Sequence, residues 1–285
     1  MKPILLLVVF ASLFTDAQLM HSPVGSLFSG ATAHASKLVD PFSSVDNPAA
    51  LAAMTRFSGG LSGERRFSLN ELSEYEMAIN VPASPGVFGF IGKYFGFAAY
   101  HEAQYSLQYA RNLSRLLNNA GSAAGNSIDI GVRFNYYSVS IPAYGSLRAI
   151  NFDIGVNLHL GDLVNAGFRI YNPLRSILDH RNGERLPSIY EAGLGYEPSD
   201  RVYIGCNVKN EEGSNGPVFR MDIEYLPATS VRIRMGMSTS AEPAYLALGY
   251  SFNSVALDAV AAYHRQLGVS PGLMLSFSKK EERIK

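Results

Sequence analysis

Hydrophobic and polar residues alternate along most of this chain with a period of two residues, not the 3.6 of a helix. In the clearest stretch, residues 150–160, every even position is apolar and every odd position is polar or glycine. The alternation recurs at residues 202–209, 219–225 and 231–238. Across these four segments all 18 residues on one face are hydrophobic, and Tyr203 is the one hydrophobic residue among the 16 on the other face. A helix cannot produce this separation, so the pattern predicts two-faced β-strands.

Extended from residue 56 to the end, the same pattern predicts fourteen strands. They lie near residues 56–66, 72–82, 86–97, 103–112, 127–140, 147–160, 164–172, 188–197, 201–210, 217–226, 230–239, 243–252, 255–264 and 271–278. From residue 147 onward, short connections alternate with longer ones. An even number of antiparallel strands, with short connections at one end and longer ones at the other, is typical of a bacterial outer-membrane barrel.

A soluble β-sandwich and a membrane barrel share this period and differ in which face points outward. The polar face of the predicted strands is poor in lysine and rich in Gly, Asn, Ser, Asp and Arg, which suits a hydrated lumen. Tyrosines on the apolar face fall near strand ends, where an aromatic girdle would meet the membrane surface. They are Tyr190, Tyr196, Tyr225, Tyr250 and Tyr263. We therefore predict a 14-stranded antiparallel transmembrane β-barrel over residues 56–279, followed by a charged C-terminal tail at 280–285.

Composition narrows the function classes. Charged residues make up 17% of the chain, and 24 Lys and Arg balance 24 Asp and Glu, so the basic surface of a nucleic-acid-binding protein is missing. One cysteine excludes an internal disulfide framework and a cysteine-rich metal site. We expect no nucleic acid partner.

The first residues predict export. Lys2 precedes an apolar run over residues 4–14, and a small residue, Ala17, follows. This pattern predicts a signal peptide over residues 1–17, with a buried N-terminal strand as the alternative. The run is too short for a transmembrane helix, which needs about 20 residues.

Residues 18–55 do not follow the strand pattern. Asn47 can cap a helical turn in which Pro48 takes the first position and Ala49 follows. We expect either a loose periplasmic tail or, as the sharper prediction, a compact N-terminal plug packed inside the barrel mouth.

The Asn47-Pro48-Ala49-Ala50-Leu51 turn resembles the Asn-Pro-Ala-Gly-Leu turn of FadL-like barrels and their PorV/PorQ relatives. The similarity continues through GVFGFIGKYFGFAAYHEAQYSLQYARNLS, through FRIYNPLRS with ERLPSIYEAGLGY, and through AAYHRQLGVSPGLMLSFS. It implies a fourteen-stranded outer-membrane protein with an N-terminal hatch. The chain departs from the family in its segment SGATAHASKLVD and is short for a fatty-acid transporter.

A search for catalytic chemistry finds no H-E-x-x-H, C-x-x-C, G-x-S-x-G or phosphate-binding loop in the sequence. We therefore expect no enzymatic activity, no cofactor and no metal. The polar cluster that stands out lies around the Pro227 turn. Its members, predicted to face the lumen, are Arg220, Asp222, Glu224, Arg232 and Arg234. A turn over residues 227–229 would set Glu224 opposite Arg232, and would also set Asp222 opposite Arg234. This ladder either stiffens the wall or has a functional role, as a polar constriction or as a docking site for the plug.

Three functions stay open. The transporter branch of the resemblance implies passive transport of a small hydrophobic molecule. The PorV/PorQ branch implies an accessory, scaffold or shuttle role in type IX protein secretion, with a secretion-machinery protein as partner and no small-molecule cargo. The third is a structural barrel without cargo. Each places the chain in the outer membrane of a Gram-negative bacterium, in contact with its lipid.

Overall fold

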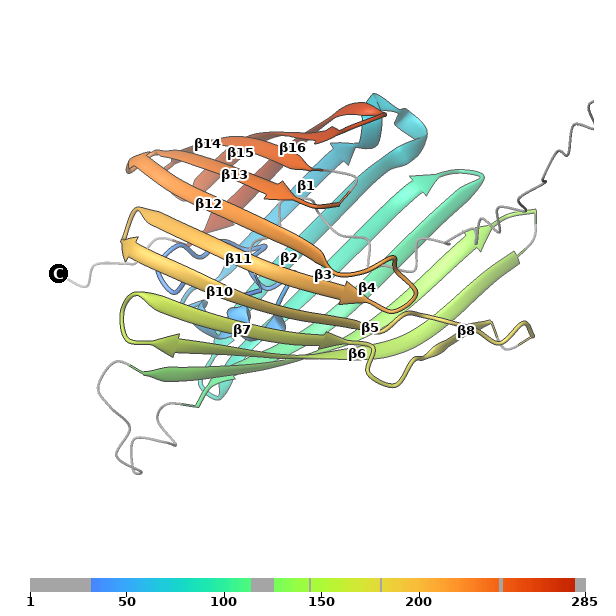
Figure 1. The fold of residues 1–285 in the computed structure, drawn as a ribbon, viewed down its shortest axis with the longest axis horizontal. Coiled ribbons are helices and arrows are strands. Elements are labelled where there is room, and N and C mark those ends of the chain that lie inside the picture. Colours follow the sequence, from blue (N-terminus) through green and yellow to red (C-terminus); the bar gives the residue numbers. More distant parts are fainter. Residues whose placement is uncertain (1–31, 114–125, 144, 180, 241–242, 280–285) are drawn as a thin grey trace, which may run out of the picture.

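The alternating segments form a closed antiparallel barrel in the computed structural model of the chain (Figure 1). The structure describes residues 32–113, 126–143, 145–179, 181–240 and 243–279. The first half of the barrel contains β1 (Ser58–Arg65), β2 (Ser73–Ala83), β3 (Gly86–Phe97), β4 (Tyr100–Asn112), β5 (Ser127–Ile141), β6 (Gly145–Leu160) and β7 (Val164–Tyr171). The second half contains β10 (Ile189–Ser199), β11 (Val202–Glu211), β12 (Val218–Ala228), β13 (Val231–Ser238), β14 (Ala244–Phe252), β15 (Val255–His264) and β16 (Gly268–Ser278). Because β1 also pairs with β16, the ring closes, and the predicted fourteen-stranded barrel is confirmed.

The predicted strand ends agree closely with the observed ones, with a few differences. β4 begins at Tyr100 and β16 at Gly268, earlier than the predicted residues 103 and 271. Between β7 and β10 the chain forms a small separate sheet from β8 (Ile177–Asp179) and β9 (Glu184–Arg185), which the sequence did not predict. Strands of two or three residues are too short to carry a periodic signal.

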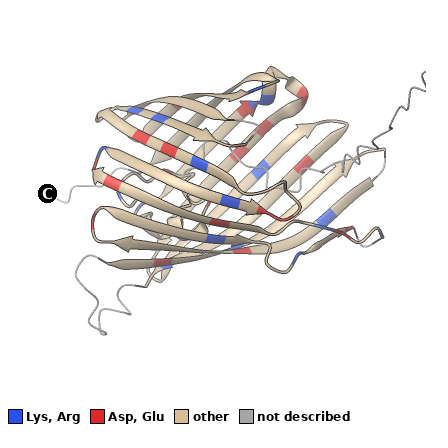
Figure 2. Ribbon diagram, viewed as in Figure 1, with Lys and Arg blue, Asp and Glu red and all other residues tan. Residues whose placement is uncertain are grey.

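The barrel is polar inside and apolar outside. On β6, Asp153 is fully buried and Asn157 is almost fully buried, whereas Ile154 between them is 44% exposed. On β12 and β13, Met221, Ile223 and Met235 are exposed in the same way. The charged positions are few and scattered along the strands (Figure 2). A water-soluble sandwich would show the opposite arrangement, so the exposed apolar band is the lipid-facing surface of a membrane barrel.

The two ends of the barrel differ in their connections. At the end where β1 starts and β16 stops, turns of two or three residues join β6 to β7, β12 to β13 and β14 to β15. The opposite end includes the longest described connection, residues 172–188. The predicted girdle tyrosines, for example Tyr190 and Tyr250, are exposed on the outer face. In outer-membrane barrels the short turns face the periplasm and the long loops face outward. Within the described residues, no helix is long and apolar enough to cross a membrane.

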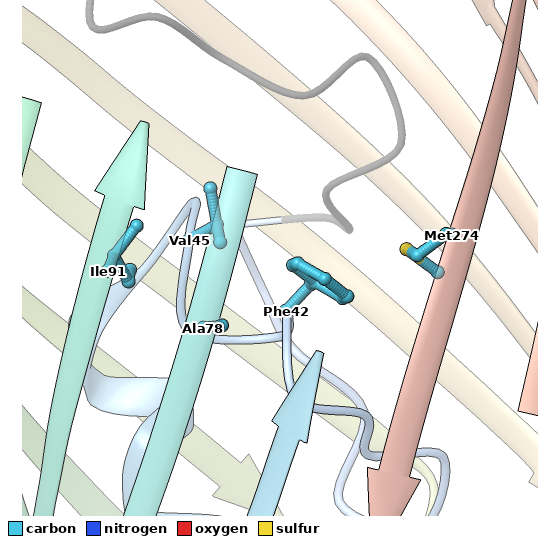
Figure 3. Close-up of a cluster of buried hydrophobic side chains, with 5 residues drawn as sticks. All are labelled: Phe42, Val45, Ala78, Ile91 and Met274. Atoms are coloured by element: carbon cyan, nitrogen blue, oxygen red, sulfur yellow. The ribbon is translucent and has the colours of Figure 1, made fainter. Parts of the chain in front are cut away.

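Residues 32–54, which we call the luminal segment, lie inside the barrel (Figure 1). Their hydrogen-bond partners come from strands on every side of the wall, including β2, β4, β5 and β13. Phe42 and Val45 pack against Ala78 of β2, Ile91 of β3 and Met274 of β16, which form a small apolar cluster (Figure 3). Residues 18–31, the first part of the predicted plug, and the predicted signal peptide lie outside the described residues.

Candidate luminal site

Two arginines of β13 bind a carboxylate of the luminal segment. Arg234 Nη1 lies 3.0 Å from Asp40 Oδ2, and Arg232 Nη1 lies 3.5 Å from the same oxygen. Both guanidinium groups also contact Asp258 of β15, at 2.8 Å from Arg232 and 3.2 Å from Arg234. Burial alone would raise the pKa of Asp40, but the Arg234 and Arg232 charges outweigh it and hold that pKa below its ordinary value. Asp40 is therefore a charged anchor between the segment and the wall.

The pairing of the predicted charged ladder differs from the sequence-based expectation. The expected partner of Glu224 was Arg232, but the structure places Arg234 opposite it. The expected partner of Asp222 was Arg234, but Gly236 lies opposite it. The predicted register is wrong because β12 continues to residue 228 and the pairing shifts between residues 225 and 228, which moves the turn.

The ladder divides into two groups as a result. Arg220 Nε donates to Asp222 Oδ1 at 2.8 Å, and the Tyr245 hydroxyl donates to the same oxygen at 2.9 Å. Glu224 lies 3.8 Å from Arg232, within the second group that contains Asp40. Asp40 itself was not predicted, because the luminal segment has no periodic pattern that would reveal which way its side chains point.

The predicted Asn47 turn lies against the wall. Asn47 Oδ1 accepts a hydrogen bond from the Ala49 backbone N–H at 3.0 Å and caps the 3-10 helix over Pro48–Ala53. Its side-chain amide donates to the carbonyls of Thr32 at 2.8 Å and of Val156 in β6 at 3.2 Å. This one side chain therefore starts the helix, ties two parts of the segment together and binds the barrel.

Four inward-facing glycines, which we call the glycine wall, allow the segment to approach the backbone of the barrel. They are Gly131 of β5, Gly155 of β6, Gly167 of β7 and Gly193 of β10. Gly131 lies directly opposite Gly155, and Gly167 directly opposite Gly193. A Cβ on Gly131 would lie 2.5 Å from the Ala49 backbone nitrogen, and one on Gly167 would lie 2.6 Å from Ala33 Cα. Any side chain here would displace the segment.

Buried polar side chains next to the glycine wall bind backbone groups of the segment. Arg133 of β5 donates from Nη1 to the carbonyls of Ser44 at 3.2 Å and Val45 at 2.8 Å. Its guanidinium group is paired with Asp153, at 2.5 Å from Nη2 and 3.0 Å from Nε. Arg169 of β7 contacts the same carboxylate at 2.8 Å. The alternation showed that these residues face inward, but it carried no signal for their partners.

Glu197 near the end of β10 holds the start of the segment. Its carboxylate accepts from the backbone N–H of Ser36 at 2.7 Å and of Lys37 at 3.1 Å. Asn165 of β7 donates to the same carboxylate at 2.5 Å. Glu197 lies at the predicted end of its strand, where the alternating pattern carries no signal for a buried anchor.

A small cavity, which we call the polar cavity, lies between the luminal segment and strands β11 to β14. Its volume is about 30 Å³. The segment contributes His34, Asp40 and Phe42 to its lining, and the wall contributes Asp222, Glu224, Arg234, Tyr203 and Tyr245. This volume is large enough for water, because one water molecule needs roughly 10–15 Å³. It cannot hold an organic molecule unless the segment moves.

Among the described residues, no group of three or more His, Cys, Asp and Glu side chains is arranged to hold a metal ion. Cys206 is an exposed free thiol. In the lumen, the wall binds the segment through Arg232 and Arg234 on one side, and through the glycine wall together with Arg133 and Glu197 on the other.

Comparisons with solved structures identify the fold. The chain is similar to the deltaS2S3 mutant of the monoaromatic hydrocarbon channel TodX, with a TM-score of 0.55 and 9% identity over 84% of this chain and 94% of that one. It is similar to the toluene transporter TbuX of Ralstonia pickettii, with a TM-score of 0.55 and 9% identity over 89% and 98%. A FadL homologue of Pseudomonas aeruginosa matches with a TM-score of 0.52 and 11% identity over 86% and 95%.

No protein-family model and no curated protein sequence matches the chain. The structural neighbours are FadL-type outer-membrane channels, so the FadL-like resemblance predicted from the sequence is confirmed at the level of the fold. The PorV/PorQ part of the resemblance stays a prediction. The closed, even-numbered barrel with an apolar outer face and a polar lumen is the architecture of bacterial outer-membrane proteins, and it locates the chain in that membrane.

Proposed function

We propose that this chain is a gated, non-enzymatic outer-membrane channel for passive entry of a small hydrophobic molecule, and that the luminal segment is its plug. The observation that carries the proposal is the position of residues 32–54, which bind opposite walls of one lumen. Asp40 contacts β13, Arg133 of β5 binds the carbonyl of Val45, and Glu197 of β10 binds the Lys37 N–H. A segment attached on several sides blocks the lumen more effectively than a tail attached at one point.

The cargo class is supported by the fold. Two of the structural neighbours are described as a monoaromatic hydrocarbon channel and a toluene transporter. The polar cavity of about 30 Å³ beside the segment is smaller than any such molecule requires. Because the segment is bound to β5, β10 and β13 across the lumen, passage of a hydrophobic cargo requires the segment to leave its seat, and the lumen is closed to such a cargo in the conformation described.

Deleting residues 23–50 tests the proposal. The truncated barrel should still insert and should migrate faster unheated than boiled in detergent gels, because the deletion removes no strand. Its conductance in planar bilayers should exceed that of the full-length chain. Cells that lack other hydrocarbon channels should take up radiolabelled toluene faster with the full-length chain than with an empty vector.

The two readouts separate the parts of the proposal. Equal conductance of full-length and truncated barrels would show that the segment does not close the lumen. A conductance increase without toluene uptake by the full-length chain would leave the plug intact and reject the hydrophobic cargo.

One observation favours a second function, an accessory role in protein secretion. Leucines are exposed in connections at the long-loop end, at Leu69, Leu174 and Leu267. Exposed apolar side chains on loops outside the lipid can contact a protein partner. If toluene uptake is absent, crosslinking from these three positions to a secretion-machinery protein is the experiment to perform next.

A further inference from the structure

The luminal segment fits its two sides differently. Toward β5, β6, β7 and β10 it meets the glycine wall, where a Cβ on Gly193 would lie 3.0 Å from the Ala33 backbone nitrogen. Toward β11 to β14 it is held by long charged side chains and leaves the polar cavity. Contacts of backbone against backbone leave no room for water, whereas contacts between charged side chain ends do. A hollow of about 300 Å³ opens at the short-turn rim of β4 to β6, beside Ser36 and Ala52 of the segment. Deeper in the lumen, the glycine wall meets the segment closely, and the loosely filled side is the one toward β11 to β14.

Two buried polar atoms in the lining of the polar cavity require a partner. Asp222 Oδ2 and Arg234 Nε are buried and make no hydrogen bond within the described part of the chain. Asp222 is 4% exposed, and its other oxygen is already used by Arg220 and Tyr245. Because buried polar atoms are almost always paired, this cavity is suited to water or a small ion.

Carboxylates outnumber guanidinium groups around this cavity. The acids are Asp40, Asp222, Glu224 and Asp258, and the bases are Arg220, Arg232 and Arg234. His34 also lines the cavity, but burial lowers its pKa, which keeps the imidazole neutral at pH 7. The balance is one negative charge, and a cavity with a surplus of negative charge attracts cations.

Building on the proposed channel function, we propose that the path past the seated luminal segment runs between it and strands β11 to β14, and that Asp222 and Glu224 make this path selective for small cations. Both side chains project inward from β12, two residues apart, and both line the polar cavity. Neither is the anchor of the segment, which is Asp40. Their charge therefore acts on an ion in the path.

The reversal potential of the full-length chain in a planar bilayer under a KCl gradient tests this inference. The residual openings of the wild-type chain should favour K⁺ over Cl⁻. The variants Asp222→Asn and Glu224→Gln should each lower the K⁺/Cl⁻ permeability ratio by about threefold, the effect expected for one charge a few ångströms from a hydrated ion. Asparagine keeps the oxygen that binds Arg220, so the wall should stay intact, and migration of unheated samples in detergent gels checks it.

Glu191→Gln provides the matched control. Glu191 is a carboxylate of β10 on the glycine-wall side that pairs with Arg169 at 3.4 Å and accepts from the Thr32 hydroxyl at 3.3 Å, and it does not line the polar cavity. Glutamine keeps an oxygen that can accept from Thr32, so the substitution removes the charge and preserves this contact. This variant should keep the wild-type ratio. A change with Glu191→Gln and none with the two β12 variants would place the path on the other side and overturn the inference. An unselective wild-type channel would also overturn it, whereas equal conductance of full-length and truncated barrels would reject the plug itself.

Discussion

Replacing Asp40 by asparagine should release the luminal segment more often while leaving the barrel folded. The carboxylate accepts charged contacts from Arg234 and Arg232, at 3.0 and 3.5 Å. A hydrogen bond to a charged group contributes about 1.5–3 kcal/mol, and the asparagine oxygen keeps a weaker version of one contact. We therefore expect the seated state to lose about 2 kcal/mol, which is about a 30-fold increase in the unseated population. Arg234 is a poorer target, because its loss would also leave the fully buried Asp258 with one guanidinium partner fewer.

The assay for this substitution is the open fraction of single channels in planar bilayers at pH 7. Asp200→Asn is the matched control, because Asp200 pairs with Lys37 of the same segment at 3.0 Å but is 84% exposed. Exposed pairs contribute about 0.2–1 kcal/mol, so this variant should change the open fraction by about twofold. If Asp40→Asn behaves like the control, the Asp40 contacts do not hold the plug. If it instead abolishes the fast-migrating form in detergent gels, Asp40 stabilises the barrel wall.

Three further predictions follow from the geometry. Gly131→Ala should raise the conductance of a folded barrel, because the new methyl group displaces the Ala49 backbone, whereas Gly92→Ala on the outer face should not. Burial lowers the pKa of His34 in the seated state, so the seated state is favoured while the imidazole is neutral. As the pH falls below about 6.5, the imidazole of the unseated segment takes up a proton, and the open fraction should therefore rise. His34→Gln should reduce this pH dependence. Ile154→Arg should cost up to about 2–4 kcal/mol of barrel stability in bilayers, depending on its depth, and Ile154→Leu should cost little, as urea titration of the fast-migrating form would measure.

The sequence was sufficient to predict the barrel because each strand carries its own information. Alternation assigns Asp153 to the lumen and Ile154 to the lipid without reference to any neighbouring strand. Barrel closure then follows from the number of strands and from the need to pair every edge inside a membrane. Because the signal is local and repeated, the assignment of strands and faces stays correct even when a predicted strand end is wrong by a few residues.

The site was harder to predict because it depends on pairing between distant residues. A register shift between residues 225 and 228 was enough to move Arg234 opposite Glu224. Asp40 belongs to a segment with no period, so its contact with β13 could not be read from the pattern. The inward glycines were visible in the sequence, but only the structure shows that Gly131 is opposite Gly155 and that both meet the Asn47 turn.

The polar side chains that line the lumen are better suited to binding the luminal segment than to binding a hydrophobic cargo. A segment without strand or long helix leaves many backbone groups unpaired, and buried backbone groups need partners. Arg133 donates to the carbonyls of Ser44 and Val45, and Glu197 accepts from the N–H groups of Ser36 and Lys37. These side chains are therefore explained by the segment they bind. A hydrophobic cargo bound along the same wall could not replace these contacts: Arg133 would keep Asp153 and Glu197 would keep Asn165, but each would lose its hydrogen bonds to the segment. A buried polar group that loses a partner costs about 1–3 kcal/mol. In the proposed channel, cargo must pass while water enters and solvates these groups, so unseating the segment and hydrating the lumen are one event.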